Sequence, residues 1–162
     1  LADNSSLVSK YISGFKIKRK YSKSLNYAIG YRYYHQKDDL VFEKSHRAYF
    51  DVYVKRKVNK VIGFTARNRA QSQKNIDKSI NKIRQKLTLE YSFKNFGANL
   101  FLAFESFCVL GDGFEKLRYI IGLEKALGER LDFNINYMLQ REINVVYPEM
   151  LSVFRTKLSY SI

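Results

Sequence analysis

Three stretches near the C-terminus decide the fold: LRYIIGLE at 117–124, LDFNINYMLQ at 131–140 and FRTKLSYSI at 154–162. In each stretch, apolar residues recur at every second position, and most of the residues between them are polar or charged. Successive side chains of a β-strand point to opposite faces, so each stretch predicts a strand with one apolar and one polar face. This pattern is typical of a strand with lipid on one side and a wet, charged interior on the other.

The same alternation occurs about nine times along the chain. The earlier segments begin near Val8, Leu25, Arg47, Ile62, Arg84 and Asn99. No stretch keeps an apolar period of 3.6 residues over three turns, and the nearest candidate, residues 73–86, is too polar to bury a face. We therefore expect an all-β chain: a single domain over residues 1–162 that forms an antiparallel, up-and-down transmembrane β-barrel with about nine strands.

The connections between these segments are expected to alternate in length. Short ones are predicted near 21–24, 57–60, 94–97 and 126–129, and longer ones at 36–45, 71–81, 109–114 and 142–149. Transmembrane barrels have short periplasmic turns and longer outer loops, whereas this alternation of lengths is not expected in soluble barrels and sandwiches. The rhythm therefore favours a barrel in the outer membrane of a Gram-negative bacterium.

The order of the connections also bears on the number of strands. Because the first connection is short, Leu1 is expected on the outer side, while Ile162 ends on the periplasmic side. Bacterial barrels usually have an even strand number with both ends periplasmic. We therefore expect at least one more strand on the N-terminal side of Leu1, and ten or more strands natively.

Composition narrows the classes of function. The chain has 162 residues, a formal net charge of +14 and a single cysteine, Cys108. One cysteine excludes an internal disulfide and a metal site built on several thiolates, and we expect neither a metal nor another cofactor. No apolar run reaches the roughly 18 residues of a transmembrane helix. The positive charge alone would fit nucleic acid, but the rhythm of the connections argues against a soluble basic barrel of that kind.

Many charged residues fall on the polar face of the predicted strands, where they would line the lumen. We expect an ion-pair network there, because a lone buried charge is costly. The predicted network contains Arg32, Arg47, Asp51, Arg67, Arg69, Arg84, Glu90, Glu105, Arg118, Glu124 and Arg155. Its simplest role is structural, and long Arg and Lys side chains in a barrel of this size argue against an open pore.

A second basic group lies near the short turns and could contact lipid phosphates or an acidic partner. It contains Lys18, Arg19, Lys20, Lys23, Lys55, Arg56, Lys57 and Lys60.

Three stretches resemble a known family: Tyr27–Tyr34 (YAIGYRYY), His46–Arg69 and Glu115–Pro148. They are similar to the uncharacterised outer-membrane barrel family of Bacteroidota known as domain of unknown function 2490. The resemblance implies a β-barrel in the outer membrane, in contact with lipid and lipopolysaccharide. It implies no activity.

An alternative hypothesis places a catalytic site beside one of the predicted outer loops. The two histidines, His35 and His46, flank this loop, and Ser45 and Asp51 lie close to His46 in sequence. A lipid- or lipopolysaccharide-modifying enzyme could use His46, Ser45 and His35, although spacing alone defines no triad.

The last strand alternates from Phe154 to Ile162, as the barrel-assembly machinery requires of its substrates and as closure of a barrel also requires. The favoured hypothesis is a structural or accessory subunit of a larger outer-membrane complex.

Overall fold

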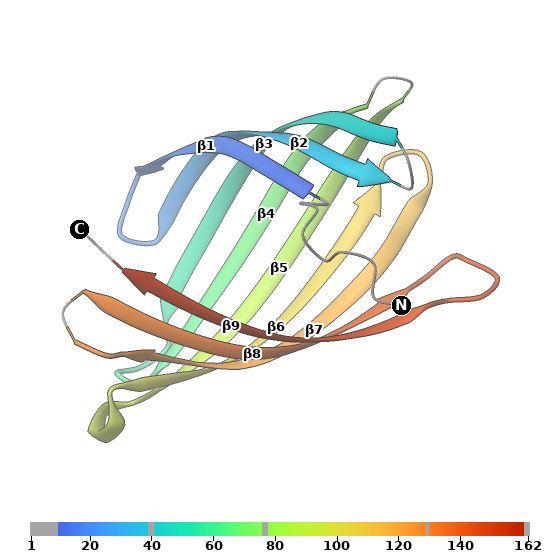
Figure 1. Cartoon of the computed structure of the whole chain (residues 1–162). Helices are drawn as coiled ribbons and strands as arrows, with labels where there is room; N and C mark the ends of the chain where they lie inside the picture. Colours follow the sequence, from blue (N-terminus) through green and yellow to red (C-terminus); the bar gives the residue numbers. More distant parts are fainter. Residues whose placement is uncertain (1–9, 39–40, 76–77, 129, 161–162) are drawn as a thin grey trace.

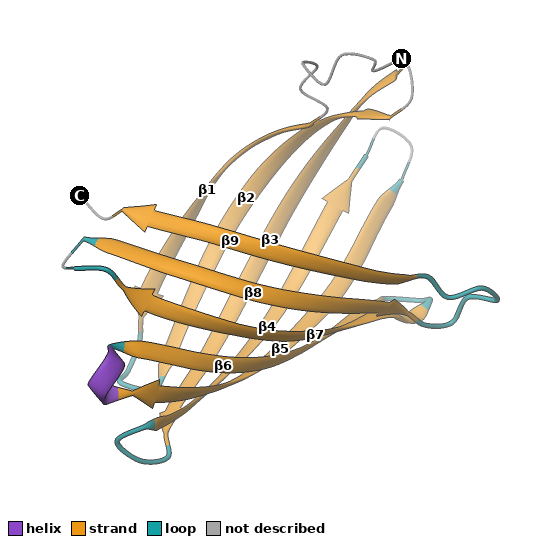
Figure 2. Cartoon of the chain, turned by 60° about the horizontal axis from the view of Figure 1, so that its bottom comes forward, coloured by secondary structure: helices purple, strands orange, loops and turns teal. Residues whose placement is uncertain are grey.

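The computed structural model describes residues 10–38, 41–75, 78–128 and 130–160. Within these residues, the chain forms one nine-stranded sheet in which the strands follow one another in sequence order (Figure 1). The strands are β1 (Lys10–Lys20), β2 (Leu25–Asp38), β3 (Val41–Lys57), β4 (Ile62–Lys74), β5 (Ser79–Phe93), β6 (Ala98–Val109), β7 (Gly113–Ala126), β8 (Leu131–Glu142) and β9 (Met150–Tyr160). A 3-10 turn, Lys94–Phe96, follows β5 (Figure 2).

The predicted antiparallel, up-and-down architecture is confirmed. Each of the eight ladders is antiparallel and joins strands that are adjacent in sequence. The sheet curls into half a barrel, with β1 and β9 at its two edges (Figure 1). The predicted start of the first strand at Val8 and the last residue, Ile162, lie outside the described residues. Among the described residues, no helix has the length and apolar character needed to cross a membrane.

The connections between strands do not alternate in length as the sequence predicted. At one rim, here called the short-turn rim, residues 21–24, 58–61, 94–97 and 127–130 connect the strands, as expected. At the opposite rim the connections are mostly not long. The ladder of β2 and β3 continues to the pair Asp38 and Val41, and that of β4 and β5 continues to Lys74 and Ser79.

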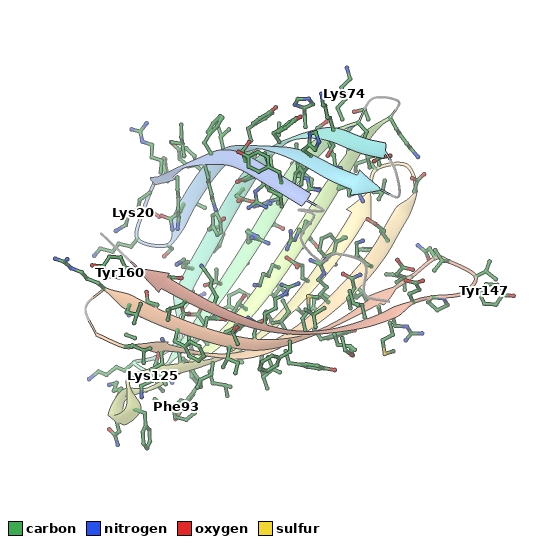
Figure 3. All side chains as sticks on the ribbon, viewed as in Figure 1. Lys20, Lys74, Phe93, Lys125, Tyr147 and Tyr160 are labelled. Carbon is green, nitrogen blue, oxygen red and sulfur yellow. The ribbon has the colours of Figure 1, made fainter. Side chains whose placement is uncertain are left out.

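The predicted long connections at 36–45 and 71–81 are therefore largely strand. The backbone of the described residues in these two segments still pairs across the ladders, so a polar sequence alone does not mark a loop there. The connection from β8 to β9, residues 143–149, is the longest between described strands. Figure 3 shows Lys20, Phe93, Lys125 and Tyr160 toward the short-turn rim, with Lys74 and Tyr147 at the opposite rim.

The outer face of the curled sheet is apolar. The large apolar side chains exposed on it include Phe15, Ile29, Phe50, Leu87, Leu89, Leu102, Phe104, Tyr119, Ile121, Tyr137, Phe154 and Leu158. The accessible surface of the chain is 12275 Å², whereas a compact soluble monomer of this mass exposes about 8,400 Å². An exposed apolar face of this extent is typical of a surface that contacts another protein or a membrane, because soluble monomers rarely expose contiguous apolar patches beyond a few hundred Å².

Candidate functional site: a charged inner face

The inner face of the curl collects the polar side chains of every second position. Two neighbouring cross-strand rows carry most of the charge. One row runs through Asp51, Arg69, Arg84 and Phe107, and the other runs through Tyr53, Arg67, Lys86, Glu105, Arg118 and Gln140. Residues that are directly opposite in a ladder project from the same face, so the register alone places these groups side by side.

Asp51 on β3 is one of two carboxylates at the centre of this face, and its side chain is fully buried. Arg69 on β4 binds it with two parallel hydrogen bonds, Nε to Oδ1 at 2.7 Å and Nη2 to Oδ2 at 2.9 Å. The Tyr53 hydroxyl donates to Oδ2 at 2.8 Å, and Lys16 Nζ lies 3.6 Å from the same oxygen. The burial of this carboxylate is therefore compensated by a two-pronged guanidinium pair, the strongest type of side-chain ion pair.

Glu105 on β6 is the second carboxylate, and it is contacted by three guanidinium groups. Arg84 binds it through two hydrogen bonds, Nε to Oε1 at 2.6 Å and Nη2 to Oε2 at 2.8 Å. Arg67 Nη2 donates to Oε1 at 2.9 Å, and Arg118 Nη1 lies 3.6 Å from Oε2. Glu105 is 1% exposed. The three positive groups offset the burial of this carboxylate, and their contacts tie β4, β5 and β7 to β6.

Aromatic rings lie among these charges, and those of Tyr49 and Phe107 contact guanidinium groups. The guanidinium carbon of Arg69 lies 3.9 Å from the centroid of the Tyr49 ring. Those of Arg84 and Arg118 lie 4.7 and 4.5 Å from the centroid of the Phe107 ring. Cations attract the negative face of an aromatic ring, so these rings stabilise guanidinium groups that outnumber the carboxylates.

Tyr49 needs space on the neighbouring strand, and Gly30 provides it. A Cβ atom at Gly30 would overlap Cζ, Cε2 and the hydroxyl of Tyr49. We expect Gly30→Ala to displace the ring from Arg69 and to lower the free energy of unfolding by about 1–3 kcal/mol, the usual range for overpacking. Denaturant titration of the folded protein in detergent measures this change.

Gly63→Ala is the matched control, because a Cβ at Gly63 has its nearest neighbour at 3.7 Å, an ordinary contact. This variant is expected to change the unfolding free energy by less than about 0.5 kcal/mol. Equal effects of the two substitutions would contradict the proposed role of Gly30.

The other predicted network residues are placed less centrally. Arg47 donates from Nε to Gln73 Oε1 at 3.0 Å and lies over the Tyr34 ring. Arg32 lies 5.7 Å from the Tyr49 ring centroid, and Arg155 Nη2 lies 3.4 Å from Met138 Sδ. No described cation lies within 4.0 Å of the carboxylates of Glu90 or Glu124. Six of the predicted residues therefore form two ion-pair clusters: Asp51 with Arg69, and Glu105 with Arg67, Arg84 and Arg118.

Sequence reasoning missed several members of these clusters. Lys16 and Tyr53 complete the Asp51 cluster, Tyr49 and Phe107 supply the rings, and Gln140 accepts from Arg118 Nε at 2.7 Å. One signal was present in the sequence. Three aromatic residues occupy positions whose side chains project from the polar face of their strands: Tyr49, Tyr53 and Phe107. An aromatic residue at such a position predicts a ring beneath a cation.

The three residues of the catalytic alternative are not brought together. Ser45 projects from the inner face, where Gln73 Nε2 donates to its Oγ at 3.4 Å. His46 projects from the outer face, where its Nδ1 is hydrogen-bonded to the Tyr31 hydroxyl. His35 is on the outer face as well, and the Tyr33 ring lies between the two histidines, 5.3 Å from His46 and 6.5 Å from His35 by centroids. A nucleophile and its base cannot meet across a sheet, so this arrangement gives no Ser–His pair.

The imidazole of His46 is expected to have no catalytic role. His46→Ala removes an exposed hydrogen bond, so the free energy of unfolding should fall by no more than about 1.5 kcal/mol. The lipid and lipopolysaccharide composition of cells that carry this variant should stay unchanged, as mass spectrometry can show. Tyr31→Phe is the control, since it removes the same hydrogen bond and keeps the imidazole. A lipid change in His46→Ala cells alone would restore the enzyme hypothesis.

The inner face has the chemistry of a packed ionic interior. Among the described residues, no group of three or more His, Cys, Asp and Glu side chains could hold a metal ion. A cavity of about 520 Å³ lies at the short-turn rim, and Lys23, Lys55, Arg56, Lys57, Lys60 and Glu90 contribute its charged lining. The cavity is mainly cationic, whereas the ion pairs at the middle of the sheet are closely packed.

The fold and this face together define the class of protein: an up-and-down antiparallel sheet, curled as in a β-barrel, with an ionic interior and an apolar exterior. The chain belongs to the family described as Protein of unknown function (DUF2490), whose model matches residues 1–145. This match confirms the family that the resemblance in residues 27–34, 46–69 and 115–148 predicted. No curated protein sequence is significantly similar to the chain.

Proposed function

We propose that the protein is a barrel of the outer membrane of a Gram-negative bacterium that acts as a structural or accessory subunit of a larger outer-membrane complex. Its apolar outer face contacts lipid and lipopolysaccharide, or the wall of a neighbouring protein. It contacts the barrel-assembly machinery during insertion. The proposal involves no catalytic site, cofactor or nucleic acid.

The main support for this proposal is that the polar and apolar faces of the sheet are placed the opposite way from those of a soluble sheet. A soluble sheet packs its apolar face on a core and turns its polar face to water. Here the side chains buried by the curl include Asp51, Arg69 and Glu105, while Leu89, Leu102 and Ile121 are 47–49% exposed on the other side. This arrangement suits a wall between an ionic lumen and a lipid or protein surface.

The dimensions and the rims support the same environment. The strands contain 11 to 17 residues, and a tilted strand needs about 9–11 residues to cross the hydrocarbon core. Aromatic residues occur on the outer face near the short-turn rim, where Tyr91 and Phe93 lie at the end of β5. Aromatic girdles at the two membrane interfaces are a feature of outer-membrane barrels.

The subunit role is proposed because the outer face offers a surface for a partner. In the described part of the chain, the two buried carboxylates are paired with guanidinium groups, while Arg67 Nε has no hydrogen-bond partner. The apolar outer face includes a shallow depression of about 520 Å³ lined by residues such as Leu89, Phe104 and Tyr137. A partner could contact such a surface within the membrane.

Gentle detergent extraction from the native cells, followed by a native gel and mass spectrometry of the co-migrating bands, tests the proposal. We expect the protein in the outer-membrane fraction and in a band with larger outer-membrane proteins. A band that contains the barrel alone would contradict the subunit role and leave the membrane location standing. Recovery in a soluble fraction without detergent would contradict both.

A further inference from the structure

The two faces of the sheet differ in the sign of their charges. From Glu43 to Glu142, every Asp and Glu that pairs in a ladder occupies a position of the inner face. The Lys and Arg residues of the outer face lie near the ends of their strands. They include Arg19, Arg56 and Lys125 toward the short-turn rim, and Lys44, Lys74 and Arg141 toward the opposite rim. An apolar wall with cations at both ends fits a membrane with anionic headgroups.

Strand β3 shows this arrangement most clearly. Its outer face carries Lys44 and His46, then apolar residues at alternate positions from Ala48 to Val54, and then Arg56. The step from His46 to Arg56 is about 33 Å along a strand. Tilted by about 40°, this length covers about 25 Å, the height of the apolar band of an outer-membrane barrel. In the proposed barrel, the cations of β3 therefore lie at the two edges of the band, where lipid headgroups begin.

At the end of β3 away from the short turns, basic residues of three strands are neighbours. Lys44 is directly opposite His35 of β2, and His46 is directly opposite Lys74, the last residue of β4 (Figure 3). Opposed residues of an antiparallel ladder have Cβ atoms about 5 Å apart and project from the same face. These four residues, here called the cationic patch, therefore present their side chains to one region of the outer surface.

The two lysines of the patch have no acidic partner among the described residues. No described carboxylate lies within 4.0 Å of Lys44 or Lys74, and the neighbouring Glu43 occupies a position of the inner face. Lys44, His46 and Lys74 are exposed. A lysine ammonium has three donors and no acceptor, and an imidazole donates from a ring N–H. This donor set matches a phosphate group, whose oxygens accept strong hydrogen bonds from cations.

Tyrosine rings lie between the patch and the apolar band. Tyr33 is directly opposite His46, with ring centroids 5.3 Å apart, and the Tyr31 hydroxyl is hydrogen-bonded to His46 Nδ1. The outer face of β2 therefore changes from apolar at Ile29 through the two tyrosines to basic at His35. Tyrosine is enriched at membrane interfaces, where one end of its side chain is apolar and the other is wet. This order of groups matches an amphiphile with an anionic head and apolar chains better than an acidic protein.

We propose that the cationic patch binds a phosphate group of lipopolysaccharide, whose acyl chains lie along the apolar outer face of β2 and β3. Lys44 and Lys74 contact the phosphate oxygens, and His46 is adjacent to both lysines in the sheet. This inference rests on the proposed outer-membrane barrel with its short turns on the periplasmic side. That orientation puts the patch in the outer leaflet, where lipopolysaccharide is the phosphorylated lipid.

A double variant, Lys44→Gln with Lys74→Gln, tests the patch. Purified lipopolysaccharide is titrated into the protein in a neutral detergent, and binding is followed by calorimetry. We expect the affinity to fall roughly tenfold or more, since each lysine near an anionic lipid surface adds to the attraction. Lipopolysaccharide stripped of its phosphates should bind the unchanged protein as weakly as the double variant binds the intact lipid.

Arg19→Gln with Arg56→Gln is the matched control, because it removes the same charge from the outer face at the other end of the apolar band. At that distance the two arginines are screened from the patch, so the affinity should change by less than about twofold. Equal losses in the two double variants would overturn the patch, since total charge would then decide the binding. Phosphatidylglycerol is titrated in the same way. If its affinity depended equally on Lys44 and Lys74, the patch would bind lipid phosphates in general, and lipopolysaccharide would be the wrong assignment.

Vesicle flotation separates the patch from the proposed membrane location. The unchanged protein and both double variants are expected to float with phosphatidylcholine vesicles. If the unchanged protein failed to float, the membrane location would be wrong. Flotation of all three proteins with equal affinities for lipopolysaccharide would contradict the patch alone.

The leaflet is tested by labelling intact cells with a membrane-impermeant maleimide. Cys108→Ser removes the native thiol, and single cysteines are placed by Val146→Cys in the connection between β8 and β9 or by Lys60→Cys in a short turn. We expect the cysteine at 146 to react and the cysteine at 60 to stay unlabelled until the cells are opened. The reverse pattern would put the patch in the inner leaflet and overturn lipopolysaccharide as its ligand.

Discussion

Glu105→Gln is expected to lower the free energy of unfolding by about 3–5 kcal/mol, the usual cost of removing one partner from a buried ion pair. The amide keeps the size of the side chain but removes the negative charge that Arg67, Arg84 and Arg118 share. Three guanidinium groups would then lie close together around a neutral group. Urea titration of the refolded protein in detergent, followed by intrinsic tyrosine fluorescence, measures the loss.

Two further variants separate charge from packing. Glu124→Gln changes an exposed carboxylate on the same face that has no described cation within 4.0 Å, and it should alter stability by less than about 0.5 kcal/mol. Combining Glu105→Gln with Arg84→Gln should cost less than the sum of the two single changes, since the second removes one uncompensated charge. If Glu105→Gln were as mild as Glu124→Gln, the cluster would have no structural role.

Leu102→Arg is expected to destabilise the protein in phospholipid vesicles by about 2–4 kcal/mol, the cost of a cation on the lipid face near the bilayer midplane. Leu102 lies in the middle of β6, projects from the outer face and is opposite Leu89 and Ile121. The same change on a water-facing surface would alter stability by no more than about 0.5 kcal/mol. The two environments therefore predict clearly different results from guanidinium titration.

Val146→Arg is the matched control for the outer face. Val146 is 86% exposed in the connection between β8 and β9, beyond the ends of both strands. Its replacement should leave the stability in vesicles unchanged. If Leu102→Arg were equally neutral, the outer face would not contact hydrocarbon, and the membrane location would be wrong.

The strands were predictable because each has a clear period of two. Residues 131–140 illustrate this. The alternate positions that the sequence predicted to be apolar project from the outer face, and the positions between them project into the interior. The same rule placed Asp51, Arg69 and Glu105 on the inner face. Alternation depends only on local geometry, so it can be read without knowledge of the rest of the fold.

Contacts across a strand were not predictable in this way. Lys16 on β1 reaches Asp51 on β3 over β2, and Arg67 on β4 reaches Glu105 on β6 over β5. Such contacts depend on how tightly the sheet curls, and alternation carries no information about curvature. The predicted loop at 36–45 was wrong for a different reason. Ser45 and His46 are paired positions within β3, where adjacent side chains must project to opposite faces.

The strictly sequential order of the strands has a kinetic consequence. Each ladder joins two strands that are close in sequence, so each can form as a hairpin without waiting for a distant segment. Local pairing of this kind requires the closure of short loops only, and chains rich in local contacts fold faster than chains that rely on distant ones. The sheet can therefore grow one hairpin at a time.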